Sequence, residues 1–324
     1  MRLTRVATPL AVAAAVAVGV GACSTVAPTP LPSPTPSATV AAGKAPTAQS
    51  CTNAVQSYAP DGPLPAPSAI PAASTMGKIK ARGRLIAGVS ADTWLLGSRN
   101  PLSGKIEGFD IDLVQQIADA ILGPGAKVEL RVITAADRLP VLENHQVDIV
   151  VRNMTMNCDR WKTIAFSAEY YHSGQKILIR KGSSITGLAS LAGKQVCAPL
   201  GTSSLDNLVR LAPKAIPVPA ATHTQCLVNL QQGKAEAITG DDTVLAGLAS
   251  QDPYAVVLDE KAFTQEPYGV GIPADHVDMV KFVNAVLEKD RTSGDWTTSY
   301  TTWLAPTLGK GTGQPKPSYG RPTP

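Results

Sequence analysis

The sequence predicts an α/β protein of two lobes, joined by a hinge of two strands, with a ligand cleft between the lobes. Short apolar runs alternate with segments of helical periodicity, which is typical of parallel sheets covered by helices on both faces. The alternation occurs twice along the chain, which indicates two lobes. The last helices follow a strand that can return to the first lobe, so we expect two crossings, near residues 180–184 and 265–268.

The elements follow from the apolar pattern. Residues 109–122 place their apolar side chains on one helical face, and 147–151 form a short apolar run that suits a buried strand. Strands are predicted at 84–89, 128–132, 147–151, 176–180, 195–198, 215–218, 236–239, 255–258 and 268–272. Helices are predicted at 109–122, 136–144, 203–211, 224–232 and 243–249, with two more between 274 and 304.

The first 22 residues are typical of an export signal. Arg2 and Arg5 precede an uncharged apolar run from Pro9 to Ala22, which is shorter than the roughly 20 apolar residues of a membrane-spanning helix. The run ends in small residues before Cys23 and resembles a bacterial lipobox, in which that cysteine is diacylated and becomes the N-terminus. A simple signal peptide with an incidental cysteine is the alternative. Two acyl chains would hold the protein stably on the outer face of the plasma membrane.

Composition separates the folded body from its ends. Residues 23–74 are rich in Pro, Ala, Ser and Thr and predict a disordered, semi-rigid spacer, and residues 305–324 predict a disordered tail. Between them we expect three segments: 75–181 as the first part of lobe 1, 182–266 as lobe 2, and 267–304 as the return to lobe 1.

Five cysteines agree with export. Once Cys23 is lipidated, four remain, and an even number in an oxidising compartment suggests two disulfides with three possible pairings. We favour Cys197 with Cys226, inside one βαβ unit, and Cys51 with Cys158, while free buried thiols stay possible. The spacing of cysteines and histidines predicts no metal site and no cofactor, because His145, His172, His223 and His276 are scattered along the sequence.

The sequence argues against several function classes. The net charge of +4 becomes +2 once Arg2 and Arg5 are removed, and no basic stripe with interleaved aromatic residues predicts a nucleic-acid partner. The motifs of serine hydrolases and zinc proteases are missing from the sequence, and the spacing around Gly193-Lys194 is wrong for a phosphate-binding loop. We therefore expect a binding protein and no enzyme.

Seven motifs together resemble the polar amino-acid family of type II periplasmic solute-binding proteins, over residues 78–304. Each is weak alone, but their order and spacing are similar to those of actinobacterial glutamate- and glutamine-binding lipoproteins. They are Gly108-Phe-Asp-Ile-Asp112, Val147-Asp-Ile-Val150, Arg160-Trp-Lys-Thr-Ile-Ala-Phe-Ser167 with Tyr170, Leu191-Ala-Gly-Lys-Gln-Val196, Gly201-Thr-Ser203, Asp241-Asp242 and Tyr268-Gly-Val270. The resemblance implies two Rossmann-like lobes and an amino-acid ligand.

The resemblance also implies how the ligand's two backbone charges are held. Arg160 matches the arginine that binds the α-carboxylate through its planar guanidinium, although a solvated loop arginine is the alternative. Gly201, Thr202 and Ser203 open a helix and would offer a second anion-binding surface, although a plain helix cap needs the same residue types. Asp241 matches the carboxylate that binds the ammonium group.

The same motifs include Asp242, Phe109 and Asp110, and Asn153 and Thr155 follow the second of them. Asp242 is the alternative to Asp241, and both residues also suit the start of the helix that follows. The resemblance places Asn153 and Thr155 beside the ligand and gives Phe109 and Asp110 structural roles.

Specificity is expected to depend on Arg152, at the cleft-facing end of a strand. A cation there would pair with the distal carboxylate of glutamate or aspartate, unless the side chain points to the surface. Arg138 is a secondary candidate, and Trp94 either covers the aliphatic part of the ligand or packs within its lobe.

These features suggest a monomeric receptor that delivers glutamate or aspartate, or their amides glutamine and asparagine, to an ABC permease and its ATPase subunit. Two other functions stay open. One is an amino-acid sensor that reports ligand state to a signalling membrane protein. The other is an enzyme similar to cyclohexadienyl dehydratases, which share the fold and use an acid in the cleft for proton transfer.

Overall fold

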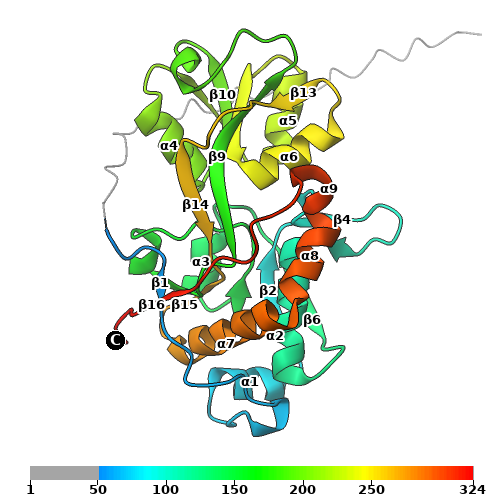
Figure 1. Ribbon diagram of the computed structural model, residues 1–324, viewed down its shortest axis with the longest axis vertical. Helices are drawn as coiled ribbons and strands as arrows, with labels where there is room; N and C mark the ends of the chain where they lie inside the picture. The colour runs from blue at the N-terminus through cyan, green and yellow to red at the C-terminus, as the bar shows by residue number, and fades with distance from the viewer. Residues whose placement is uncertain (1–50, 324) are drawn as a thin grey trace, which may run out of the picture. The chain divides into compact units, whose positions relative to one another are not determined.

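The computed structural model describes residues 51–323 (Figure 1). The predicted signal peptide, the lipidation site at Cys23 and most of the predicted spacer lie outside the described residues. Within residues 51–323, no helix is both long enough and apolar enough to cross a membrane.

Lobe 1 is built on a five-stranded sheet with the order β6-β2-β7-β15-β8. Strands β2, β6 and β7 are parallel, whereas β15 runs antiparallel to β7 and β8. The strands are β2 (Leu85–Val89), β6 (Val128–Val132), β7 (Ile149–Val150), β8 (Ile164–Phe166) and β15 (Gly271–Pro273). A small antiparallel sheet adds β3 (Asp92–Thr93), β4 (Gly97–Arg99) and β5 (Ile106–Glu107).

Lobe 1 holds the largest apolar core, which takes side chains from its sheet and its longest helices. In α2 the buried residues Leu113, Val114, Ile117 and Ile121 recur at helical spacing, as the apolar pattern predicts. The helices are α1 (Thr75–Arg82), α2 (Phe109–Leu122), α3 (Arg138–Glu143), α7 (Val277–Ser293) and α8 (Asp295–Trp303), with a 3₁₀ turn η1 (Pro67–Ala69) and another, η2 (Arg160–Lys162).

Lobe 2 is built on a six-stranded sheet with the order β11-β10-β12-β9-β13, and β14 also pairs with β9. Apolar clusters lie on both sides of this sheet. The strands are β9 (Tyr171–Arg180), β10 (Gln195–Pro199), β11 (Ile216–Ala220), β12 (Ala237–Asp241), β13 (Ala255–Val257) and β14 (Thr264–Tyr268). The helices are α4 (Ser203–Leu211), α5 (His223–Gln231) and α6 (Asp242–Gln251), with a 3₁₀ turn η3 (Leu188–Leu191).

The two crossing strands are β9 and β14, which pair antiparallel from Tyr171↔Tyr268 to Gln175↔Thr264 (Figure 1). Their presence makes the lobe 2 sheet mixed, whereas the sequence predicted parallel sheets. Parallel neighbours in a sheet are joined by a helical crossover that returns the chain to the same end of the sheet. Strand β9 enters from lobe 1 without such a crossover, and it runs antiparallel to β12 and β13.

Both favoured disulfides are present. Cys51 is bonded to Cys158, with Cα atoms 6.1 Å apart, and Cys197 is bonded to Cys226, with Cα atoms 5.5 Å apart. The first links residues 107 positions apart, so it ties the start of the described chain to lobe 1 beside η2.

The expectation of disorder at both ends is wrong for the residues that the structure describes. Strands β1 (Gln56–Ser57) and β16 (Ser318–Tyr319) pair in parallel, and we call residues 51–58 and 314–321 the terminal ribbon. Arg321 donates from Nη2 to the Asn53 carbonyl at 2.7 Å, and its guanidinium lies 3.5 Å from the centre of the Trp161 ring. A composition rich in Pro and Gly disfavours helices, but it does not prevent an extended segment from pairing at a sheet edge.

The tail also reaches lobe 2. Helix α9 (Ala305–Leu308) follows α8 and packs against α6, and the chain then returns to the terminal ribbon. The lobes are therefore in contact through a third segment besides the two crossing strands.

Candidate functional site

Lobe 1 contributes a turn and three arginines to the boundary between the lobes. The turn follows β7, and Asn153 adopts a left-handed backbone there, with φ of 35°. The Asn153 N–H donates to Asp110 Oδ2 at 2.9 Å, and Tyr170 donates to Asp110 Oδ1 at 2.9 Å. Asp110 therefore stabilises the turn by accepting these two hydrogen bonds, which agrees with the structural role expected for it.

Arg160 and Arg138 reach across to lobe 2. Arg160 donates to the carbonyl of Thr155 at 2.6 Å and to that of Gly201 at 3.3 Å. Arg138 donates to the carbonyls of Arg152 and Asn153 and, at 2.9 Å, to the same Gly201 carbonyl. Two guanidinium groups from lobe 1 thus converge on one backbone oxygen of lobe 2.

Arg152 is also buried, with 4% of its surface exposed, so the surface-pointing alternative is wrong. Its Nε donates to the Ile133 carbonyl at 3.0 Å, and the nearby charges include those of Asp92, Asp110 and Asp137. The charges of three lobe 1 acids thus act on Arg152 without forming a salt bridge, whereas Arg138 lies between the lobes.

Lobe 2 presents the first turn of α4 to these arginines. Gly201 has a φ of +71°, and a Cβ at this position would lie 2.6 Å from the Cα of Ala136 in lobe 1. Only glycine allows the lobes to approach this closely here. Thr202 caps α4 by accepting from the Leu205 N–H, and Ser203 directs its hydroxyl toward lobe 1, 3.1 Å from Thr155 Oγ1.

Asp241 ends β12 and faces the boundary. Tyr268 donates to Asp241 Oδ2 at 2.8 Å, whereas Oδ1 is buried without a hydrogen-bond partner. The neighbouring Asp242 is turned away, because its Oδ1 accepts from the Ser173 hydroxyl and from the Thr243 N–H. An orphaned buried carboxylate oxygen is costly unless a donor reaches it, so Asp241 is the better candidate for a cationic ligand group.

Glu266, on the crossing strand β14, is a residue that the sequence analysis missed. Its Oε2 accepts from Thr155 at 2.7 Å and from Ser203 at 2.6 Å, and its Oε1 accepts from Asn207 and Thr264. Glu266 is 1% exposed and so bridges both lobes from inside. The sequence did contain a signal for Glu266, because it is the acidic residue in segment 265–268, which was expected to cross between the lobes.

Burial controls the electrostatics of this boundary. It raises the pKa of Asp241 to about 7, an effect that the charge of Glu266 reinforces, and it raises the pKa of Asp110 to about 6. Burial also lowers the pKa of Arg138, and the neighbouring charges of Arg160 and Arg152 act in the same direction. The site therefore concentrates positive charge on lobe 1 opposite acids of lobe 2 and the crossing strand.

Trp94 lies at the boundary through its backbone. A Cβ at Gly247 of α6 would lie 2.8 Å from the Trp94 carbonyl oxygen, and Trp94 as a whole is 43% exposed. Nearby, Thr224 of α5 donates to the Asp92 carbonyl at 2.9 Å. Of the nine expected ligand-binding residues, Arg160, Gly201, Thr155 and Ser203 make hydrogen bonds across the lobes, whereas Arg152 donates within lobe 1.

Residues 85–306 match the family model of bacterial extracellular solute-binding proteins, family 3. The chain belongs to this family. A glutamine-binding protein of an ABC transporter from Bacillus subtilis is 36% identical over 71% of this chain and 84% of its own length. A glutamate-binding protein from Corynebacterium efficiens is 28% identical over 70% of this chain and 80% of its own length.

Two solved structures of binding proteins have a similar fold. A mutant of ArgBP from T. maritima has a TM-score of 0.66 at 27% identity and covers 71% of this chain and 99% of its own. An ancestral amino acid-binding protein, described as a precursor of cyclohexadienyl dehydratase, has a TM-score of 0.66 at 30% identity and covers 71% of this chain and 100% of its own. The named curated relatives are binding proteins.

Proposed function

We propose that this family 3 protein is a lipid-anchored receptor of an ABC importer that binds glutamate or aspartate by closure of its two lobes. In this proposal Arg160 and the first turn of α4 hold the α-carboxylate, and Asp241 holds the ammonium group. The partner permease and its ATPase subunit receive the ligand-loaded form. The relatives named for glutamine, glutamate and aspartate binding support a polar amino acid as the ligand.

One observation carries the preference for a dicarboxylic ligand. Arg138, Arg152 and Arg160 are each less than 10% exposed, and within residues 51–323 they donate only to backbone carbonyls and form no salt bridge. A buried charge is stable when it is paired, and a planar guanidinium suits a carboxylate. Glutamate or aspartate offers two carboxylates to this set, whereas glutamine offers one.

Arg138 replaces Arg152 as the first candidate for the distal carboxylate. Arg138 already donates to a lobe 2 carbonyl, and the charge of Asp241 acts on it. Arg152 donates within lobe 1 and would attract the distal carboxylate through its charge alone. Trp94, Asn153 and Thr155 would then complete the wall of lobe 1 around the ligand.

Calorimetry of the purified protein against the twenty amino acids tests the proposal. We expect glutamate or aspartate to bind more tightly than glutamine or asparagine, and micromolar affinity corresponds to about 8 kcal/mol. Arg160→Ala should abolish binding of every amino acid, because all of them share the α-carboxylate. Tighter binding of glutamine than of glutamate would contradict the assigned ligand, and normal binding by Arg160→Ala would contradict the assigned site.

The anchor and the lack of catalysis are tested separately. Incorporation of a labelled fatty acid into the wild type, and its loss in Cys23→Ser, is the expected outcome for a lipoprotein. Incubation with prephenate or arogenate should give no product, since the proposal assigns Asp241 to an ammonium group instead of a proton-transfer step.

A further inference from the structure

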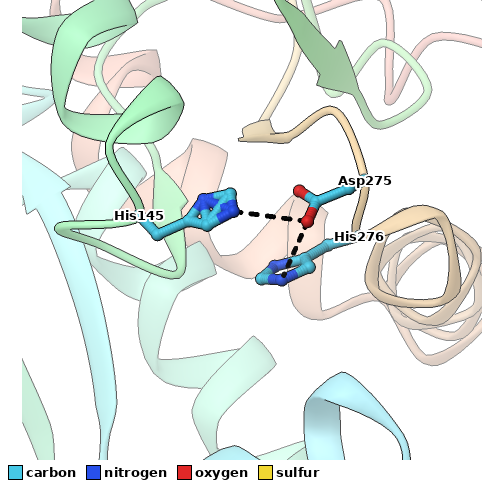
Figure 2. A group of neighbouring side chains, drawn as sticks. All are labelled: His145, Asp275 and His276. Carbon is cyan, nitrogen blue, oxygen red and sulfur yellow. Dashed lines mark hydrogen bonds and ion pairs between the residues drawn. The ribbon is translucent and has the colours of Figure 1, made fainter.

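Lobe 1 carries a cluster of three side chains that the proposed amino-acid site does not use. His145 follows α3, and Asp275 and His276 lie in the turn between β15 and α7 (Figure 2). His145 Nε2 lies 3.3 Å from Asp275 Oδ2, and His276 Nε2 lies 4.0 Å from the same oxygen. Segments separated by 130 positions in the sequence therefore direct two imidazoles at one carboxylate.

The donor set and its spacing fit a transition metal. Each residue offers one ligand atom, and the three atoms lie within 4.8 Å of one another. Imidazole nitrogen and carboxylate oxygen bind Zn²⁺ tetrahedrally at roughly 2.0 to 2.2 Å, which places neighbouring ligand atoms about 3.4 Å apart. The distance between His145 and Asp275 already has this value, and a small rotation of His276 would bring the third atom into place.

Two features favour a metal over a simple ion pair. The two imidazole rings have their centres 5.1 Å apart and both approach Asp275 Oδ2, so their nitrogen atoms can share one cation with this carboxylate. His276 Nδ1 is buried without a hydrogen-bond partner, so the local contacts do not fix the orientation of this ring.

We propose that His145, Asp275 and His276 bind a divalent transition-metal ion of the Zn²⁺ type, with water as the fourth ligand. The side chains of His145 and Asp275 are 49% and 64% exposed, so an ion reaches them from solvent. The bound ion would clamp the turn after α3 to the start of α7. All three ligands belong to lobe 1 and none is assigned to the amino acid, so this proposal does not depend on the proposed function.

Metal titration of the full-length protein, first dialysed against a chelator, tests the site. We expect ZnCl₂ to bind with one-to-one stoichiometry in calorimetry and to raise the melting temperature. Co²⁺ should give the intense visible absorption of a tetrahedral site.

Variants separate this site from nonspecific binding. His145→Ala and His276→Ala should each lower zinc affinity at least tenfold while their metal-free melting temperatures stay at the wild-type value. His172→Ala is the matched control, because His172 is a half-exposed histidine that pairs with Glu169 elsewhere on the chain, and it should bind zinc as the wild type does. Zinc binding that survives in His276→Ala, that disappears in His172→Ala, or that requires millimolar zinc would overturn the proposal.

Discussion

The most informative perturbation of the amino-acid site is Asp241→Asn. Asp241 is 4% exposed, one of its carboxylate oxygens accepts from Tyr268, and the other has no partner. An ammonium group would supply the missing donor. A hydrogen bond to a charged group contributes about 1.5 to 3 kcal/mol, so the variant should bind glutamate on the order of 10- to 100-fold more weakly.

The same residue predicts a pH dependence. Burial raises the pKa of Asp241 to about 7 in the ligand-free chain, whereas an ammonium group binds the ionised carboxylate. Affinity should therefore rise with pH up to about 7 and level off above it, falling by nearly tenfold for each pH unit below. Asp241→Asn should remove this slope.

Stability of the ligand-free protein should show the opposite trend. The pKa of Asp241 is higher in the folded chain than its ordinary value of 3.8, so the native state retains a proton that the unfolded state has released. This contribution is present below about pH 4 and is lost as the pH rises to about 7.

Calorimetry and thermal unfolding between pH 5 and 8 check both trends, with Asp242→Asn as the matched control. The Asp242 carboxylate already accepts from Ser173 and from the Thr243 N–H, so its variant should keep both the affinity and the slope. If Asp241→Asn bound glutamate as tightly as the wild type, or if Asp242→Asn lost the pH slope, the ammonium group would be assigned to the wrong residue.

Three further outcomes are expected. Arg152→Ala should reduce the preference for glutamate over glutamine by less than Arg138→Gln does, since of these two arginines only Arg138 contacts lobe 2. Calorimetry with glutamate and glutamine checks this difference, and equal effects of the two variants would count against the assignment of Arg138. Glu266→Gln should shift the ligand-free protein toward an open form, because an amide oxygen accepts hydrogen bonds from the hydroxyls of Thr155 and Ser203 less strongly than a carboxylate does. Small-angle scattering should then show a larger radius of gyration, and an unchanged radius would refute the bridging role of Glu266. The double change Cys51→Ser and Cys158→Ser should lower the free energy of unfolding by about 2 to 5 kcal/mol in denaturant titration, whereas a loss below 1 kcal/mol would mean that the terminal ribbon holds without its disulfide.

The sequence predicted those features of the fold that repeat over several residues. Helix α2 has the predicted bounds, Phe109–Leu122, since a long apolar stripe and flanking glycines define both ends. Strand β9 was predicted only from residue 176, because its first half is mostly polar and shows no apolar pattern, although it is largely buried where it pairs with the other crossing strand. The terminal ribbon was missed because its pairing joins segments at opposite ends of the chain, which local composition does not reveal.

The candidate site was predictable where one residue type is required by the chemistry. Arg160, Asp241 and the turn after β10 were predicted in this way, and their contact with a ligand stays a prediction. The ranking of Arg138 and Arg152 was not predictable, since it depends on which guanidinium reaches Gly201 in the other lobe. The proximity of His145 and His276 likewise depends on the pairing of β7 with β15.

The terminal ribbon determines where mechanical load enters the molecule. The chain segment before Cys51 is joined to lobe 1 by a covalent cross-link two residues from Arg160, and the last strand pairs beside it. A pull on the N-terminal side is therefore transmitted to lobe 1 and bypasses β9 and β14. If the protein is anchored through its N-terminal segment, as proposed, lobe 1 stays near the attachment point while lobe 2 moves about the two crossing strands.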